Sequence, residues 1–424
     1  MNETLDTPSP PRVQSAAPRI AWTVVAILMA FCFISHMNRV SMSIAADEQI
    51  MAEYNIMPTE MGRVYSAFLL VYTLFMIPGG LFIDRFGVRV ALAVMGFATA
   101  AFGALTGLSG FFAAANLLLA LLVVRAVMGF FTTPLHPGCA RAVALWTAPG
   151  RRSFANGLVT GAALLGVACT PPVFGALMDS VGWQAAFLVT AGLTALIAVA
   201  WWAVTARARS AVVAPAAYRR AIDWKLLTSR NVVLLTLSYS AIGYFQYLFF
   251  YWMHYYFDHV LRLGKTESRL YAALPVLTMA LAMPVGGWLS DRLQTRYGWR
   301  PGRAFVAGAS MLGAALFLAF GVITAIPEIT VAAFTLALGT LGVSESAFWN
   351  TAAETGAEAG ATAAAVMNTG GNGIGLLAPL ATPWIAELLG WRSGIAVGGI
   401  ICLLGAVCWL WIRPDSANEM AAEQ

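Results

Sequence analysis

Long apolar stretches alternate with short polar segments along almost the whole chain. A helix needs about 20 mostly apolar residues to cross the hydrocarbon core of a bilayer. Strands with open edges cannot cross it, because each unpaired backbone group costs several kcal/mol in lipid. The pattern therefore predicts an all-α membrane protein with twelve transmembrane helices. The expected spans are 20–45, 60–83, 88–109, 111–137, 153–177, 183–206, 232–257, 270–289, 303–324, 328–352, 360–388 and 391–412.

The longest polar stretch inside the chain divides six expected spans from the other six. It is rich in Lys and Arg, as a loop between two membrane bundles can be. The first 19 residues are polar and Pro-rich, and they lack the order of a cleavable signal peptide. The predicted parts are a cytoplasmic tail at 1–19, a bundle at 20–206, a linker at 207–230, a second bundle at 231–413 and a tail at 414–424.

The Lys and Arg residues lie unevenly on the two sides of the expected spans. Short loops on the cytoplasmic side of a membrane protein carry an excess of these residues. If the N-terminus is cytoplasmic, most of the 25 basic residues share that side. We therefore expect both termini in the cytoplasm and the protein in the inner (plasma) membrane. The few basic residues expected on the outer side are Arg63, Arg262, Lys265, Arg269 and Arg392.

The composition agrees with a membrane protein. Apolar residues make up 59% of the chain and charged residues 11%, whereas soluble domains carry about 25% charged residues. The net charge of +5 comes from the loops, so we expect a lipid bilayer and no nucleic acid as partner. The five cysteines lack CxxC spacing, and no catalytic motif appears, so neither an enzyme nor a cofactor is expected. The sequence offers no metal-site partners for His136, His254 and His259.

One short signature occurs twice, about half a chain apart. Gly80-Leu-Phe-Ile-Asp84-Arg85 follows the second expected span, and Gly287-Trp-Leu-Ser-Asp291-Arg292 follows the eighth. Carriers are often built from repeated halves with a binding site between them. The repeat favours a carrier, and the pairs Asp84-Arg85 and Asp291-Arg292 are candidates for gating at the cytoplasmic side.

Further motifs resemble the major facilitator superfamily and, within it, the anion:cation symporter family. That family includes bacterial carriers of hexuronate, galactonate, glucarate, tartrate and phthalate, and the animal sialin-type transporters. The resemblance implies two six-helix bundles that expose a site between them to either side in turn. The motifs are Asn38-Arg39-Val-Ser-Met-Ser, Gly62-Arg-Val-Tyr-Ser, Arg125-Ala-Val-Met-Gly, Gly286-Gly-Trp-Leu-Ser-Asp-Arg and Asn368-Thr-Gly-Gly-Asn372.

Arg39 and Arg125 are the two basic residues within the expected spans. A charge in the bilayer centre costs roughly 2.5–3.5 kcal/mol on insertion scales, so such residues usually face the bundle interior. Their own spans offer no acid as a partner, and a guanidinium binds a carboxylate through two hydrogen bonds. By resemblance, both arginines would hold the substrate anion; a structural ion pair is the alternative.

Other residues are candidates for binding the same anion. Tyr72, Ser346 and Trp349 match family positions that line the cavity, and His36 stands where many members have Tyr. Asn368 and Asn372 share one face of a helix and suit either ligand contact or helix–helix hydrogen bonds.

The coupling residues depart from the family pattern. Asn38 and Thr132 stand where the family usually has its proton-coupling Asp and Glu. Glu345 is a clear acid within a span and is the candidate substitute, although a structural or ion-pairing role is also open. His36 is the next candidate, because imidazole titrates near neutral pH.

These observations predict a secondary active transporter of an organic carboxylate, either a sugar acid, an aromatic acid or a dicarboxylate. A proton or another cation would drive it, and we expect a monomer. An uncoupled facilitator, an anion exchanger and a non-transporting anion sensor are the alternatives. The sequence does not name the anion.

Overall fold

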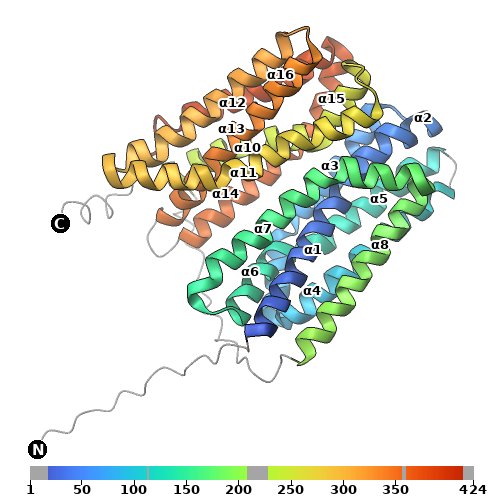
Figure 1. Cartoon of the computed structure of the whole chain (residues 1–424), viewed down its shortest axis with the longest axis horizontal. Coiled ribbons are helices and arrows are strands. Elements are labelled where there is room, and N and C mark those ends of the chain that lie inside the picture. Colours follow the sequence, from blue (N-terminus) through green and yellow to red (C-terminus); the bar gives the residue numbers. More distant parts are fainter. Residues whose placement is uncertain (1–17, 112–113, 208–227, 356–359, 414–424) are drawn as a thin grey trace, which may run out of the picture.

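The computed structural model describes residues 18–111, 114–207, 228–355 and 360–413, and every regular element in these ranges is helical. The tails and most of the linker expected at 1–19, 207–230 and 414–424 lie outside the described residues. Helices from the first half of the chain form one group, and helices from the second half lie beside them (Figure 1).

The first group contains seven long helices and the short α2. The helices are α1 (Pro18–Ala45), α2 (Met51–Tyr54), α3 (Pro58–Leu74), α4 (Met76–Leu108), α5 (Ala114–Thr132), α6 (Leu135–Trp146), α7 (Arg152–Cys169) and α8 (Gly175–Arg207). The second group contains α10 (Arg230–Tyr255), α11 (Lys265–Tyr297), α12 (Val306–Ile323), α13 (Pro327–Glu354), α14 (Gly360–Gly375), α15 (Leu377–Leu389) and α16 (Trp391–Cys408). Single π-helical turns include η1 (Ala46–Ile50), η4 (Thr170–Phe174), η6 (Tyr256–Val260) and η7 (Arg300–Phe305).

Nine helical stretches of the described chain are long and apolar enough to cross a membrane. One of them, Arg152–Ala206, has 55 residues and contains two expected spans. The expected spans at 60–83 and 360–388 are each built from two shorter helices, α3 with the start of α4 and α14 with α15. With these, the helices account for all twelve expected spans.

Two glycines reverse the direction of the chain inside α4 and α8, and each separates two neighbouring membrane spans. Gly87 within α4 has φ 79° and ψ 155°, and Gly182 within α8 has φ 77° and ψ 163°. Such positive φ angles suit glycine because it has no Cβ. The two turns therefore separate the second span from the third and the fifth from the sixth.

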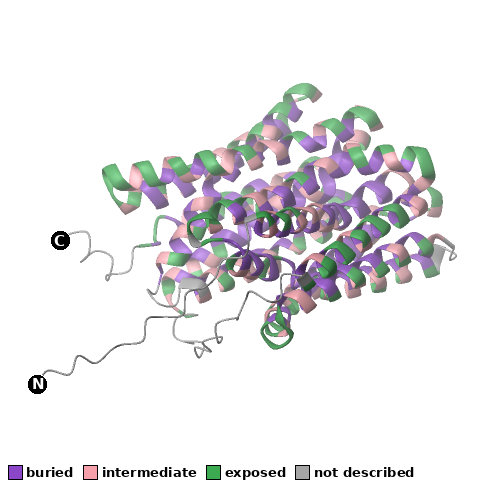
Figure 2. Cartoon of the chain, turned by 60° about the horizontal axis from the view of Figure 1, so that its bottom comes forward, coloured by how far each residue is buried: buried purple, intermediate pink, exposed green. Residues whose placement is uncertain are grey.

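Close helix contacts depend on small residues. A Cβ at Gly286 of α11 would lie 2.1 Å from the carbonyl oxygen of Val343 in α13. Lipid tails are as apolar as the side chains, so helices in a membrane associate largely through such close packing. Exposed apolar residues such as Leu81, Leu281 and Leu404 cover the outer faces of the helices, where the bilayer would contact them (Figure 2).

The two halves meet mainly at the end that carries α2 and α15, opposite the two termini (Figure 1). There, the Ser66 hydroxyl donates to the carbonyl of Leu376 at 2.8 Å, and the Tyr65 ring stacks on Tyr251 at 5.1 Å. A Cβ at Gly62 of α3 would lie 2.4 Å from the carbonyl oxygen of Pro379 in α15. These contacts close this end of the interface.

The glycine contact between α11 and α13 gives a test of the packing. Changing Gly286→Ala forces a methyl group into the Val343 backbone, and overpacking of this kind costs about 1–3 kcal/mol. We expect a lower unfolding temperature in detergent. Gly192→Ala is the control, because a Cβ there would meet no atom within 4 Å; an equal loss in both variants would contradict the packing role.

Candidate binding site between the two halves

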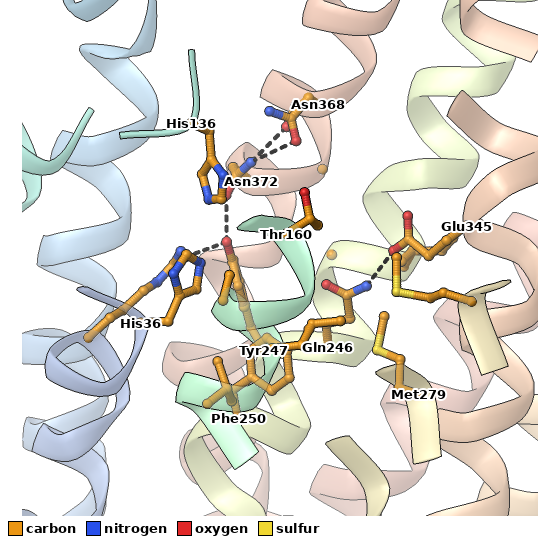
Figure 3. A pocket seen from close by; sticks show the side chains of 18 of the residues that line it. His36, His136, Thr160, Gln246, Tyr247, Phe250, Met279, Glu345, Asn368 and Asn372 are labelled. Atoms are coloured by element: carbon orange, nitrogen blue, oxygen red, sulfur yellow. Dashed lines mark hydrogen bonds between the residues drawn. The ribbon is translucent and has the colours of Figure 1, made fainter. Parts of the chain in front are cut away.

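A cavity of about 650 Å³ lies between the two halves of the chain (Figure 3). Helices of both halves line it, so a molecule bound there would contact both. Its polar lining residues from the first half are His36, Arg39, Tyr72, His136, Asn156 and Thr160; those from the second half are Tyr239, Gln246, Tyr247, Glu345, Trp349, Asn368 and Asn372.

Arg39 supplies the positive charge of this cavity and is the one Arg or Lys among the described lining residues. Its guanidinium carbon lies 5.5, 5.3 and 4.7 Å from the ring centres of Phe68, Tyr72 and Tyr247. Faces of aromatic rings stabilise a cation without neutralising it. The Nε donor of Arg39 has no partner among the described residues. The aromatic rings thus hold the guanidinium in place, and the ion pairs of the described residues include none with Arg39.

A hydrogen-bonded chain joins Arg39 to the second half. Its Nη2 donates to the Tyr247 hydroxyl, and that hydroxyl donates to Oδ1 of Asn372. The Asn372 amide donates in turn to the carbonyl of Asn368 at 2.9 Å. A carboxylate that displaced the Tyr247 hydroxyl from Arg39 would also disturb this link between the halves.

Glu345 of α13 is the acid of the cavity, and three donors surround its carboxylate. Gln246 Nε2 lies 2.7 Å from one oxygen, whereas the Tyr239 hydroxyl and Trp349 Nε1 each lie 3.2 Å from the other. Figure 3 shows Gln246 reaching toward Glu345 across the cavity wall. A carboxylate with three donors accepts all of them most readily when ionised.

Two histidines lie together on the side of the first half. The rings of His36 and His136 are 5.1 Å apart in an edge-to-face arrangement, and His36 Nδ1 lies 2.9 Å from the Cys32 carbonyl (Figure 3). His136 was not a candidate from the sequence, because it lies 100 positions from its neighbour. Gln246 was also missed, although an amide beside Tyr247 in an apolar span is a usable signal.

The structure places most of the expected binding residues at the cavity. Two expected residues lie elsewhere. Arg125 is buried beneath α1, where its Nη1 and Nη2 donate to the carbonyls of Asn38 and Arg39 at 2.9 and 2.7 Å. Ser346 faces α11 and donates to the carbonyl of Met283 at 3.3 Å. The expected residues that line the cavity are His36, Arg39, Tyr72, Glu345, Trp349, Asn368 and Asn372.

Asn38 and Thr132 make local hydrogen bonds away from the cavity. The Asn38 amide donates to the Thr194 hydroxyl at 2.9 Å, and the Thr132 hydroxyl donates to the Met128 carbonyl at 2.7 Å. Both side chains are buried and neither titrates near neutral pH. Asn38 therefore joins α1 to α8, whereas the bond of Thr132 lies within α5.

The two Asp-Arg signatures form equivalent contacts within their own halves. Asp84 pairs with Arg141 at 2.7 Å, and Asp291 pairs with Arg303 at 3.0 Å. The guanidinium groups of Arg85 and Arg292 lie over the rings of Phe86 and Trp288, each at 5.4 Å. Each Asp therefore pairs with an Arg of its own half, Asp84 just before the Gly87 turn of α4 and Asp291 near the end of α11.

His254 and His259, for which the sequence offered no metal-site partners, both lie beside the carboxylate of Asp47. His254 Nδ1 contacts one carboxylate oxygen of Asp47, and His259 Nε2 lies 2.7 Å from the other. Asp258 lies beside them, with one atom each of Asp47, Asp258 and His259 within 4.8 Å of one another. These residues come from both halves, about 200 positions apart, so sequence spacing could not join them.

A cavity at the interface of two helical membrane halves, with one caged arginine, defines a membrane transport protein. The sequence model of the Major Facilitator Superfamily matches residues 28–379, and this chain belongs to that family. The family is one of transporters rather than enzymes, as expected from the sequence, and its fold has twelve transmembrane helices.

Relatives of the chain carry small organic anions. A protein of Cupriavidus necator described as a probable sulfoacetate transporter is 27% identical and covers 94% of this chain and 96% of its own. The D-galactonate transporter of Escherichia coli is 27% identical over 66% of this chain and 70% of its own. The ascorbate transporter of Arabidopsis thaliana chloroplasts is 26% identical over 92% of this chain and 75% of its own.

A solved structure has the same fold. A bacterial homologue of the human lysosomal transporter Spinster, in an inward-facing and occupied conformation, superposes with a TM-score of 0.74. It covers 94% of this chain and 97% of its own, at 15% identity. The likeness shows the same helical fold, in agreement with the all-α architecture predicted from the apolar pattern.

Proposed function

We propose that this protein moves an organic carboxylate across the inner membrane by alternating access, with both termini in the cytoplasm. The main support is Arg39, a caged cation with an unpartnered donor in a cavity between the two halves. Guanidinium binds carboxylate through a two-pronged geometry, and several relatives carry such acids. A cavity of about 650 Å³ accommodates a sugar acid, an aromatic acid or a dicarboxylate.

The polar lining supports a hydroxylated acid as substrate. Asn368, Asn372 and Gln246 can donate to and accept from hydroxyl groups, and the rings of Tyr72 and Trp349 can pack against the carbon chain. In this arrangement, the carboxylate binds Arg39 and the remainder of the substrate reaches toward α13 and α14. Arg125 has a different role. Its guanidinium donates to the backbone carbonyls of Asn38 and Arg39 in α1 and so positions Arg39.

Coupling to protons would then use Glu345. The usual acidic positions carry Asn38 and Thr132, whereas Glu345 is a buried acid that lines the cavity. Its carboxylate accepts hydrogen bonds from Gln246, Tyr239 and Trp349, so proton uptake requires that these contacts rearrange. Substrate contact with Gln246 or Trp349 supplies such a change.

An uncoupled facilitator or anion exchanger is the second candidate. It is favoured by one observation: Asn38 and Thr132 form hydrogen bonds that need no proton. Dependence of accumulation on a pH gradient distinguishes the two functions.

Arg39→Ala should abolish transport, because the carboxylate loses its counter-charge. Arg39→Lys should retain less than about a tenth of the activity, since a point charge cannot reproduce two parallel hydrogen bonds. A thermal-shift screen of the purified protein against sugar acids, aromatic acids and dicarboxylates selects the ligand. Counterflow of that labelled acid in proteoliposomes then measures transport.

Arg63→Ala is the control for this test, because Arg63 is exposed on α3 away from the cavity. It should transport as the wild type does. Wild-type half-saturation in Arg39→Ala would refute the assignment of the anion site.

Glu345→Gln should separate exchange from accumulation. The amide keeps the shape of the side chain and removes its titration. We expect the variant to exchange substrate by counterflow at a rate within about twofold of the wild type. It should no longer accumulate substrate when a pH gradient is applied. If accumulation persists in the variant, Glu345 is not the coupling site; if the wild type ignores both pH gradient and membrane potential, the exchanger function holds.

Asp84→Asn tests the proposed gating role of the Asp-Arg signatures. Both partners of the Asp84–Arg141 pair are partly exposed, so its loss should cost about 0–1 kcal/mol of stability. We expect slower turnover in counterflow with half-saturation changed less than about twofold. Loss of the protein from the membrane, with normal turnover of what remains, would indicate a local folding role instead.

A further inference from the structure

A cluster of seven charged side chains joins the two halves at the end opposite the termini. We call it the outer cluster, a name that rests on the orientation proposed above. Charges of opposite sign come from opposite halves. Its acids are Asp47, Glu48 and Asp179 of the first half, and its bases are His254, His259, Lys265 and Arg269 of the second.

Arg269 of α11 is the centre of the outer cluster. Its Nε and Nη2 lie 2.7 and 2.5 Å from the two oxygens of Glu48, and its Nη1 lies 2.5 Å from Asp179. A Cβ at Gly175 would lie 2.3 Å from Arg269 Nε, so glycine leaves the space that the guanidinium occupies. Lys265 bridges the same two acids from the exposed rim. The guanidinium of Arg269 thus joins the second half to two acids of the first half.

His254 is the second buried base of the outer cluster, and its side chain is 4% exposed. Its Nδ1 contacts Asp47, and its Nε2 lies 3.2 Å from Glu48 Oε1. Both ring nitrogens therefore lie near carboxylate oxygens, Nδ1 in a hydrogen bond with Asp47 and Nε2 in an ion-pair contact with Glu48 that is not a hydrogen bond. A neutral imidazole has one N–H and one lone pair, and the lone pair would be held against a carboxylate; an imidazolium donates from both nitrogens.

This arrangement changes when the halves separate. The two acids that face His254 belong to the first half, whereas His254 belongs to the second. Opening the outer end moves the imidazole away from both acids and hydrates all three groups. The proton is thus held more strongly in the sealed form than in the open form, and sealing takes up a proton.

We propose that His254 is a proton-binding site that seals the outer end of the transporter, so that external acidity favours the sealed form. Buried ion pairs lie close to balance between desolvation and attraction, and a single bound proton can therefore shift the equilibrium between the two forms. This site differs from Glu345: it changes the conformation and carries no proton through the cavity.

Other groups around the site titrate or carry charge. His259 also reaches Asp47, but its side chain is 47% exposed, so water replaces its partner more easily. The charged and titratable groups that face His254 directly or through its two acids are Asp47 and Glu48 of η1, Tyr65 of α3, Asp179 of α8, Tyr255 of α10, Asp258 and His259 of η6, and Lys265 and Arg269 of α11.

The opening of the outer end can be measured with a pair of spin labels. Ala52 of α2 and Glu387 of α15 are exposed on opposite halves at this end, and Ala52→Cys with Glu387→Cys provides the attachment sites. The background replaces Cys32, Cys139, Cys169, Cys402 and Cys408 by Ala. Pulsed electron spin resonance in nanodiscs gives the sealed and open populations from pH 5.5 to 8.5, with EDTA present to remove divalent ions.

In the wild type, the ratio of sealed to open protein should fall as pH rises, by up to about tenfold per pH unit where one proton is exchanged. His254→Gln should make the ratio constant within about twofold across this range. His259→Gln is the matched control and should retain at least half of the slope, and His36→Gln controls for the cavity histidines.

A flat wild-type ratio, or an unchanged slope in His254→Gln, would overturn the proposal. So would loss of the slope in His259→Gln alone. If His254→Gln fails to fold, Asp47→Asn replaces it: the slope and the sealed fraction should both decrease, and unchanged values of both would overturn the proposal. The measurement needs no substrate. If the sealed fraction depends on pH but the protein shows no counterflow, the proposed transport activity is refuted, whereas the proposed proton-binding site is supported.

Discussion

Every charged group placed among apolar helices must have a partner, and this constraint shapes the interior of the protein. A charge at the bilayer centre costs roughly 2.5–3.5 kcal/mol on insertion scales and more by other estimates. Arg125 meets the requirement with two backbone carbonyls of α1, and Glu345 meets it with three side-chain donors. Arg39 meets it only in part, with a tyrosine hydroxyl and three aromatic rings. It is therefore the buried cation best suited to take a partner from outside the protein.

The same constraint separates rigid contacts from contacts that can break. Asp84–Arg141 and Asp291–Arg303 join helices within one half and can persist through a relative movement of the halves. Arg39–Tyr247 and the outer cluster join different halves, so they must break when the interface opens. A transporter that works by alternating access needs both kinds. In the outer cluster, acids of the first half pair with bases of the second, so water can solvate each set of charges once the halves separate.

Membership of the Major Facilitator Superfamily explains the architecture, whereas the local chemistry belongs to this chain. Asn38 and Thr132 occupy positions where the resembled family carries acids, and each donates a hydrogen bond within the first half. Titratable groups instead occur at the cavity, in Glu345 and the His36–His136 pair, and at the outer cluster.

The sequence alone determined the helical class, the spans and the repeat of Asp-Arg signatures, because hydropathy and spacing are local properties. It also marked Arg39 and Glu345, since a charge within an apolar span stands out whatever surrounds it. Only the tertiary structure decided that Arg125 supports the α1 backbone, that Ser346 faces α11, and that His254 lies between two acids. Those outcomes depend on the rotation of each helix and on contacts between residues about 200 positions apart. The division into two bundles at 207–230 stays a prediction, because most of that linker lies outside the described residues.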